Sequence, residues 1–256
     1  MTYADKSLDQ IRAEMNARYA DGSAYAAHCP WDLDRHHLLI ESVVRFVSGK
    51  WAGGADRACG DALDVGCAGG GMVDLLPSPT RYVGLDISDD AVRLAAVAHP
   101  NGQYVQGAVE TTNWVSEFDT VIAIESIEHW ANVSDGLAAV KRALRPNGIF
   151  VVTTPNRDSL HVTIGKKLGI DVPYCSFDHV KEFGFDELIG VVTGAGFRRL
   201  DSTGVGLMPY WALEREFGNR IRKLTDNDAD VYYKLNRAGA GVPSLAFLQV
   251  HVFAAS

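Results

Sequence analysis

The stretch ALDVGCAGGG, residues 62–71, decides the fold. An apolar run that carries one acid, Asp64, breaks here into glycines at positions 66, 69, 70 and 71. Glycine has no Cβ and tolerates positive φ, so a buried parallel strand can end here in a turn whose backbone approaches a ligand. Residues 72–77, MVDLLP, can begin a short helix. We therefore predict a strand, a glycine turn and a helix, with a small molecule bound at the carboxyl end of the strand.

The composition disfavours several classes of protein. The 256 residues, 47% of them hydrophobic, suffice for one large domain or for a core with a cap. A net charge of −8 argues against a nucleic-acid-binding protein, because affinity for phosphate backbones comes from clustered Lys and Arg. The sequence contains no run of roughly 18 apolar residues that could span a membrane, and no secretion signal at its start. We expect a cytoplasmic protein that binds neither nucleic acid nor membrane, with its cysteines reduced because they form no CxxC.

A second strand is predicted over residues 81–88 and ends in an acid, Asp86. Asp86 lies twenty residues after Gly66, the spacing at which the second strand of a βαβ unit brings a carboxylate to a ribose. A carboxylate can accept two hydrogen bonds from a ribose diol. We expect the following helix to begin at the cap Ser88, with Asp89 and Asp90 in its first turn.

Strands and helices continue to alternate after this helix. Further strands are predicted at 103–109, within 118–130, at 148–156 and at 197–205, with helices at 135–145 and 185–194. Such alternation predicts a parallel sheet covered by helices on both faces. The strand within 118–130 ends in Glu125, Glu128 and His129, which places these side chains at the same sheet edge as the glycine turn.

Segments before and after the predicted core extend the fold. Amphipathic helices at 5–20 and 33–47 can cap the binding crevice at the carboxyl ends of the strands. Trp31, His36 and His37 either face this crevice or are solvated. Residues 160–176 should lie over the same crevice, and residues 206–244 form a long excursion before the last strand at 245–254. The excursion carries aromatic and basic side chains, namely Tyr210, Trp211, Phe217, Tyr232, Tyr233, Arg215, Arg220, Arg222 and Lys223. These can grip a sugar or polyphenol, or they can pack in the core or in the face of a homodimer.

Taken together, the sequence resembles the class I S-adenosylmethionine-dependent methyltransferases. The stretches that carry the resemblance are LDVGCAGGG, VGLDIS, FDTVIAIESIEHW, LRPNGIFVVTTPN and VVTGAGFRRL, in the family's order. A nicotinamide enzyme is disfavoured because GCAGGG lacks the GxGxxG spacing. The resemblance implies a Rossmann-like α/β fold, with a seven-stranded, mostly parallel sheet, helices on both faces, N-terminal helices and a helical cap insertion. It divides the chain into an N-terminal helical cap (1–54), a cofactor-binding core (55–205), and a helical excursion with the last strand (206–256), which completes the same domain.

The resemblance also implies where S-adenosylmethionine binds. Asp64, Gly66, Gly69 and Gly71 would hold its amino-acid end, with Cys67 in the same turn as a packed thiol. Asp86 would bind the ribose hydroxyls, and Ile87 would lie against the adenine. The edge of the adenine and the methionine portion would lie near Ala108, Val109, Glu110, Ile124 and Glu125.

Within the superfamily, the chain resembles groups whose fourth strand ends in E-x-x-E-H, a cluster associated in them with a divalent metal. Ubiquinone-pathway O-methyltransferases and small-RNA 2′-O-methyltransferases are two such groups. The likeness implies Mg²⁺ or Mn²⁺ bound by Glu125, Glu128, His129 and, from the later segment FDHVKEF, His179. His129, His179 and Glu125 would be catalytic, with His129 or His179 accepting the proton of the acceptor hydroxyl. In metal-free relatives the glutamate caps a helix and the histidine lines the pocket, so this alternative stays open.

The acceptor is expected to be a small molecule. The acidic chain lacks the basic surface of an RNA methyltransferase, and it shows no clear amphipathic membrane-facing helix of a quinone enzyme. The TTPN and DHVKEF segments resemble those of methyltransferases that act on sugar hydroxyls. A saccharide or similar polyhydroxylated metabolite is therefore favoured. The alternatives are a phenol or quinone precursor, and a non-catalytic subunit that keeps only the fold.

Overall fold

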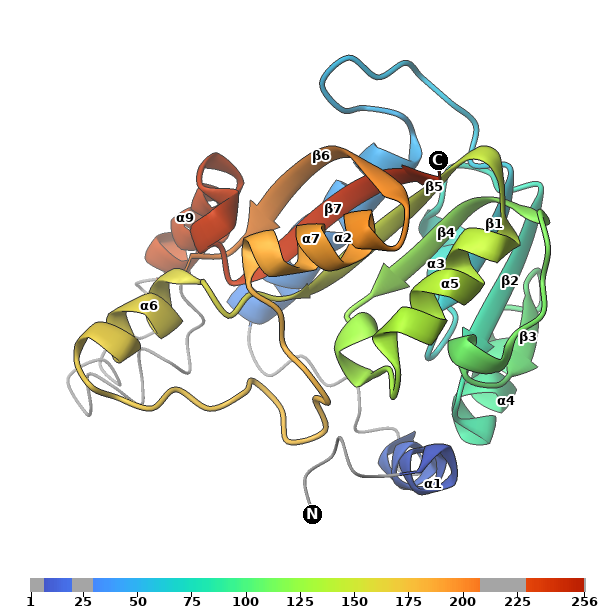
Figure 1. Ribbon diagram of the computed structural model, residues 1–256, viewed down its shortest axis with the longest axis horizontal. Coiled ribbons are helices and arrows are strands. Elements are labelled where there is room, and N and C mark those ends of the chain that lie inside the picture. The colour runs from blue at the N-terminus through green and yellow to red at the C-terminus, as the bar shows by residue number, and fades with distance from the viewer. Residues whose placement is uncertain (1–6, 20–29, 208–228, 256) are drawn as a thin grey trace.

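The centre of the molecule is one seven-stranded sheet. The computed structural model describes residues 7–19, 30–207 and 229–255. The strands are β1 (Asp61–Val65), β2 (Arg81–Asp86), β3 (Gln103–Gln106), β4 (Phe118–Ile124), β5 (Leu144–Pro155), β6 (Phe197–Val205) and β7 (Leu248–Ala255), in the order β3-β2-β1-β4-β5-β7-β6 (Figure 1). The first five strands pair in parallel, whereas β7 runs antiparallel to β5 and β6. The predicted mostly parallel α/β sheet is confirmed.

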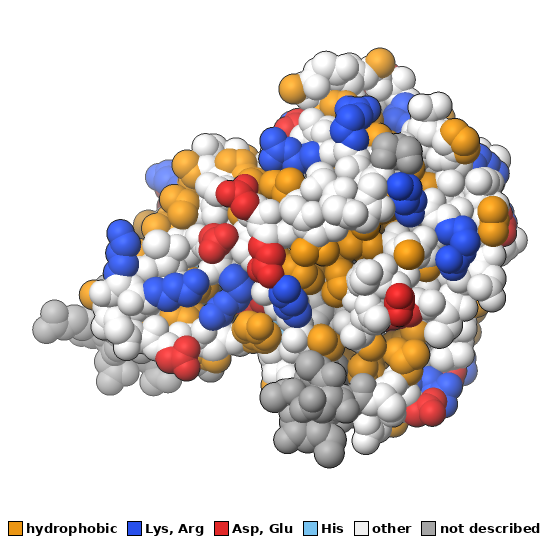
Figure 2. Space-filling model, viewed as in Figure 1, with side chains coloured by type: hydrophobic (Ala, Val, Ile, Leu, Met, Phe, Trp, Pro, Cys, Tyr) orange, Lys and Arg blue, Asp and Glu red, His pale blue; other side chains and the backbone are white. Residues whose placement is uncertain are grey.

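Helices cover both faces of this sheet, as predicted. The α-helices are α1 (Leu8–Tyr19), α2 (Pro30–Val47), α3 (Met72–Leu75), α4 (Asp89–Ala98), α5 (Val133–Ala143), α6 (Leu160–Lys167), α7 (Phe185–Gly194) and α9 (Ala229–Ala238). An apolar cluster that includes Leu137 and Leu188 packs α5 and α7 on one face. A second cluster, which includes Phe46 and Met72, packs α2 and α3 on the other. Figure 1 shows α5 and α7 in front of the sheet and α2 behind it. On the same face, Figure 2 shows charged side chains of both signs scattered among hydrophobic ones.

Side-chain caps fix where two of these helices begin. The Ser88 hydroxyl accepts the Ala91 N–H at 3.1 Å, which confirms the predicted cap of α4. Asn132 caps α5 in the same way through the Asp135 N–H, at 3.2 Å. These bonds satisfy backbone donors that have no partner within the first turn of a helix. Each helix therefore begins shortly after the carboxyl end of a strand, where loops of the sheet edge gather.

Several predicted boundaries were wrong. The helix predicted at 135–145 ends at Ala143, and the next strand begins at Leu144 because this residue pairs with Phe118. The register of β4 against β5 then shifts, and Asn147 takes a φ of +65°. The strand predicted at 103–109 stops at Gln106, since Val109–Thr111 forms a 3-10 helix, η3. The last strand starts at Leu248 because another 3-10 helix, η8 (Pro243–Leu245), precedes it.

The predicted cap excursion is described only at its end. Most of its aromatic and basic residues, Tyr210, Trp211, Arg215, Phe217, Arg220, Arg222 and Lys223, lie outside the described residues. The end of the excursion is α9, which packs on α2, and Arg237 of α9 donates to both carboxylate oxygens of Asp34 at 2.9 and 3.0 Å.

None of the helices in the described ranges combines the length and apolar character that a membrane crossing needs.

Candidate functional site

A cavity of about 140 Å³ lies at the carboxyl edge of the sheet. The loops after β1 to β4 contribute Gly66, Asp86, Ile87, Ala108, Val109, Glu110, Glu125 and Ser126 to its wall. Leu8, Ile11 and Met15 of α1 also line it. In Figure 1, α1 lies at the bottom of the view, at the end of the sheet toward which β4 points. The structure thus brings seven of the residues predicted near the cofactor to one cavity, namely Gly66, Asp86, Ile87, Ala108, Val109, Glu110 and Glu125.

The turn after β1 requires glycine at two positions. Gly66 has a φ of +77°, and a Cβ there would lie 2.5 Å from Ser126 Oγ. Gly70 has a φ of +78°, and its Cβ would lie 2.7 Å from the Tyr104 hydroxyl. L side chains rarely adopt this backbone conformation. At Gly69, by contrast, a Cβ would meet no atom within 4 Å.

Asp86 joins the glycine turn to the start of α4. Its carboxylate is 6% exposed and accepts the N–H groups of Ala68 and Ser88, each at 2.9 Å. Burial raises the pKa of Asp86, and the backbone N–H bonds oppose this effect. Each carboxylate oxygen has a second lone pair, so the group can accept further hydrogen bonds in the cavity.

Five predicted cofactor residues, Asp64, Cys67, Gly69, Gly71 and Ile124, do not line this cavity as the described residues form it. Asp64 is 2% exposed and accepts a hydrogen bond from the Tyr82 hydroxyl at 2.6 Å, and burial raises its pKa to about 7. The Cys67 thiol packs against Gly84, where a Cβ would lie 2.7 Å from its sulfur, and burial raises the pKa of this thiol. Contact between these five residues and a cofactor stays a prediction.

A second cavity, of about 460 Å³, adjoins the first, and Glu125 and His129 line both. Its wall also contains Arg35, His36 and Leu39 of α2, Glu128, Pro155, Cys175, Ser176, Asp178, His179, Phe247 and Leu248. The lining therefore combines acidic and other polar residues with apolar ones. Glu125, His129 and His179, the residues for which the resemblance implies a catalytic role, all line this cavity, and their role in catalysis stays a prediction.

Glu128, His129 and His179 form a tight cluster in this wall. One candidate ligand atom of each lies within 4.8 Å of the others. Glu128 is 1% exposed and accepts the Thr154 hydroxyl at 2.9 Å. The pKa of Glu128 is raised well above its ordinary value, mainly by burial and secondly by the neighbouring Glu125 carboxylate. The two imidazole rings meet edge to face, with their centroids 4.8 Å apart.

Backbone bonds bring the parts of this cluster together. Glu128 and His129 belong to the 3-10 helix η4 (Ile127–His129), which directly follows β4. The Glu128 carbonyl accepts the N–H groups of Val180 and Lys181, at 2.8 and 3.1 Å. These two hydrogen bonds place His179 beside Glu128, although it lies about fifty residues further along the chain.

The fourth predicted metal ligand, Glu125, is held by a different partner. Thr153 donates its hydroxyl to Glu125 Oε1 at 2.7 Å and accepts the Glu125 N–H at 3.0 Å. Glu125 has a φ of +48°, uncommon for a residue other than glycine. Burial raises its pKa to about 7, and the Thr153 bond and His179 act in the opposite direction. The structure therefore clusters three of the four predicted ligands and leaves Glu125 at the junction of the two cavities.

Sequence reasoning missed several residues of these walls. His36 lines the second cavity, whereas His37 lines neither and the side chain of Trp31 lies outside the described residues. The residues that sequence reasoning did not single out include Arg35, Leu39, Ser126, Asp178, Phe247 and Leu248, whereas Cys175 and Ser176 belong to the segment 160–176 that was expected over the crevice. Leu8, Ile11 and Met15 belong to the helix that was expected to be able to cap the crevice, and in the structure they line the first cavity.

Comparison with known proteins identifies the family. The sequence model of a protein family described as a methyltransferase domain matches residues 31–202, about two thirds of the chain. A probable S-adenosylmethionine-dependent methyltransferase of Mycolicibacterium smegmatis is 33% identical over 178 residues, which cover 67% of this chain and 61% of that protein. The chain thus matches less than two thirds of that relative. A ubiquinone biosynthesis O-methyltransferase of Methylobacterium nodulans is 30% identical over 173 residues, or 61% of this chain and 68% of the relative.

Solved structures share the fold at low identity. A protein described as a methyltransferase, solved in complex with the Haloferax volcanii Trm112 activator, superposes with a TM-score of 0.64 at 17% identity, covering 94% of this chain and 97% of that one. Magnesium protoporphyrin IX methyltransferase of Synechocystis gives a TM-score of 0.60 at 14% identity, covering 98% and 100%. The carboxyl-edge cavity, the domain match and these relatives agree: the chain belongs to the S-adenosylmethionine-dependent methyltransferase family.

Proposed function

We propose that the protein transfers a methyl group from S-adenosylmethionine to a hydroxyl of a saccharide or similar polyhydroxylated small molecule, with the help of a divalent cation. The observation that carries the proposal is the position of the Glu128, His129 and His179 cluster. It lies beside Glu125, where the cavity of the predicted cofactor residues meets the larger second cavity. An acceptor hydroxyl bound there would adjoin the methionine end of the cofactor. Methyl transfer needs such an alignment of nucleophile and methyl group.

The cofactor would occupy the first cavity. Asp86 would accept hydrogen bonds from the ribose hydroxyls, because its carboxylate lines the wall and has lone pairs beyond its two backbone bonds. Ile87 and the loop 108–110 would enclose the adenine. Leu8, Ile11 and Met15 of α1 would exclude water from the bound cofactor.

The cluster residues fit a divalent cation chemically. A carboxylate and two imidazoles are donors that Mn²⁺ accepts, and Glu125 adds a second carboxylate at the junction. A bound cation would lower the pKa of a coordinated hydroxyl and fix its direction. With both imidazoles bound to the cation, Glu125, which lines both cavities, would accept the proton. His129 or His179 would be the general base only in the alternative without a cation, because an imidazole that coordinates a cation through one nitrogen and carries a proton on the other has no lone pair left.

The lining of the second cavity suits an acceptor that has both hydroxyl groups and an apolar face. Ser176, Asp178 and the cluster offer hydrogen-bond partners, while Leu39 and Phe247 offer an apolar surface. A sugar ring combines these two properties. A phenol or quinone precursor is the second candidate, supported by the relatives named as ubiquinone biosynthesis O-methyltransferases and by the same apolar surface.

The test is production of S-adenosylhomocysteine with a panel of glycosides and catechols, before and after EDTA, and after Mg²⁺ or Mn²⁺ is added back. We expect turnover with a glycoside that EDTA abolishes and a cation restores. Turnover with catechols alone would favour the second candidate. Turnover that EDTA leaves unchanged would refute cation assistance, and failure to bind S-adenosylmethionine in calorimetry would favour a non-catalytic subunit.

A further inference from the structure

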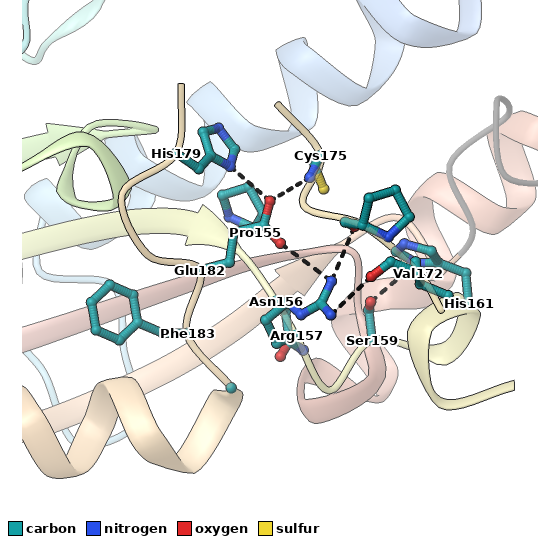
Figure 3. A network of polar contacts seen from close by, with 12 residues as sticks. Pro155, Asn156, Arg157, Ser159, His161, Val172, Cys175, His179, Glu182 and Phe183 are labelled. Carbon is teal, nitrogen blue, oxygen red and sulfur yellow. Dashed lines mark hydrogen bonds and ion pairs between the residues drawn. The ribbon is translucent and has the colours of Figure 1, made fainter. Parts of the chain in front are cut away.

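Glu182 is a buried carboxylate that lies behind the cluster rather than in the wall of the second cavity. It is 4% exposed, and its Oε1 lies 2.7 Å from His179 Nδ1. The same oxygen accepts the Cys175 N–H, and Oε2 lies 3.7 Å from an Arg157 guanidinium nitrogen. Figure 3 shows these contacts converging on Glu182: His179 and Cys175 lie on the same segment as Glu182, and Arg157 lies just after β5. A buried carboxylate is costly unless it is paired and hydrogen-bonded, so this arrangement needs an explanation.

The hydrogen bond to Glu182 determines which nitrogen of His179 carries the proton. An ionised carboxylate only accepts, so Nδ1 must donate, and in the neutral ring Nε2 then has the lone pair. His129 follows the same rule, because its Nδ1 lies 3.1 Å from the Asp178 carbonyl oxygen, which also only accepts. Both imidazoles would thus have their lone pair on Nε2, and one ring nitrogen of each belongs to the cluster with the Glu128 carboxylate.

Arg157 holds Glu182 and the surrounding loop in place. Its guanidinium donates to the carbonyls of Val172 and Pro173, at 2.9 and 3.1 Å, and lies 5.2 Å from the centre of the Tyr174 ring. The Arg157 N–H donates to the Phe183 carbonyl at 2.9 Å. Arg157 therefore binds both ends of the segment 172–183, which carries Glu182 and His179, and supplies the positive charge nearest to the buried carboxylate (Figure 3).

We propose that Glu182 is a positioning residue, which locks His179 in the Nδ1–H tautomer so that Nε2 serves as a cation ligand with Glu128 and His129. The carboxylate–histidine pair is an arrangement that fixes ring orientation and ligand basicity at metal sites generally. The part of this inference that concerns a cation rests on the proposed function. The part that concerns the tautomer does not.

The tautomer is tested first, without any cation. Long-range ¹H–¹⁵N NMR spectra of the wild type at alkaline pH should show one imidazole, absent in His179→Gln, as an Nδ1–H tautomer. Glu182→Leu should move that signal toward the Nε2–H tautomer, while the signals of the other histidines stay in place. A wild-type His179 that is protonated at Nε2 would overturn the inference even if no Glu182 variant folds.

Cation affinity is tested next, by calorimetry with Mn²⁺ alone. Glu182→Leu should weaken Mn²⁺ binding roughly 10- to 100-fold, the usual effect of losing such a partner, and Glu182→Gln, which keeps an acceptor oxygen, should weaken it less. Glu187→Gln is the matched control: this carboxylate is half-exposed and pairs with Lys181. Affinity for S-adenosylhomocysteine should be unchanged in all three variants.

A double-mutant cycle shows whether Glu182 acts through His179. In a His179→Ala background, Glu182→Leu should cause no further loss of Mn²⁺ affinity. An undiminished loss there would overturn the positioning role. A wild type that binds no Mn²⁺ would refute the cation part of the proposed function, and the NMR result would still decide the tautomer.

Discussion

Replacing Asp86 with alanine should separate cofactor binding from folding. The carboxylate would accept the two ribose hydroxyls while it keeps the N–H groups of Ala68 and Ser88. A hydrogen bond to a charged group contributes about 1.5–3 kcal/mol, so two could supply about 3–6 kcal/mol. Burial already disfavours the charged carboxylate, as its raised pKa shows, and this offsets part of that sum. We therefore expect roughly a 100-fold loss of affinity, about 2.7 kcal/mol.

The assay is calorimetric titration of wild type and variants with S-adenosylhomocysteine. Asp89→Ala is the matched control, because Asp89 lies in the first turn of α4 and is exposed. Asp86→Ala also leaves two backbone N–H groups without an acceptor, which lowers the free energy of unfolding by about 1–3 kcal/mol for each group. Binding is therefore measured well below the melting temperature of the variant. A folded Asp86→Ala variant whose affinity lies within about threefold of wild type, less than 1 kcal/mol, would refute the ribose role.

Three further predictions concern the same sheet edge. Gly70→Ala should lower the melting temperature because its Cβ meets Tyr104, whereas Gly69→Ala, with no protein atom within 4 Å of its Cβ, should leave the melting temperature unchanged; equal effects would contradict the assignment of strain to Gly70. His129→Ala should abolish turnover while affinity for S-adenosylhomocysteine stays near wild type, and retained turnover would exclude a catalytic or metal-binding role. Asp64→Asn should stabilise the protein by up to about 4 kcal/mol above pH 7, since the folded-state pKa of Asp64, about 7, exceeds its ordinary 3.8. The unfolded chain releases this proton first, so the contribution of Asp64 to stability is full below pH 3.8 and is lost as pH rises to about 7. Denaturant unfolding of both proteins from pH 4 to 8 checks the sign, and a constant difference between them would contradict it.

Local signals in the sequence were sufficient for the strands and caps. Apolar runs such as 62–65 become strands because both faces of a parallel sheet are buried, so periodicity and turn residues identify them. Ser88 predicted the start of α4 because a cap acts within three residues of its helix. The boundary at Leu144 failed for the opposite reason. Its pairing with Phe118 is a long-range contact that overrides the helical pattern of 135–145.

The candidate site was predictable only where strand ends carry it. Glu125, Glu128 and His129 directly follow a strand, so the topology of a parallel sheet brings them to the ligand edge. Glu182 had no such signal, because it stands among other acids between residues 158 and 187. Of these, Asp178 and Glu182 are buried, whereas Asp158, Asp171, Asp186 and Glu187 are exposed. The difference arises from tertiary contacts with Arg157 and His179, which no local pattern encodes.

The acids at the carboxyl edge are better explained by a ligand than by folding. Burial raises the pKa of Asp64 and of Glu125 to about 7, which means that the empty fold disfavours their charged forms. Thr153 and Thr154 donate to Glu125 and Glu128, but neutral hydroxyls compensate a buried carboxylate only in part. The opposite charge that would compensate them fully is carried by the proposed ligands, a sulfonium cofactor and a divalent cation. Strongly perturbed acids that face a shared cavity are typical of sites built for binding rather than for stability. Glu125, Glu128 and their histidine partners therefore form one functional unit at the second cavity, whereas Asp64 lines neither cavity that the described residues form.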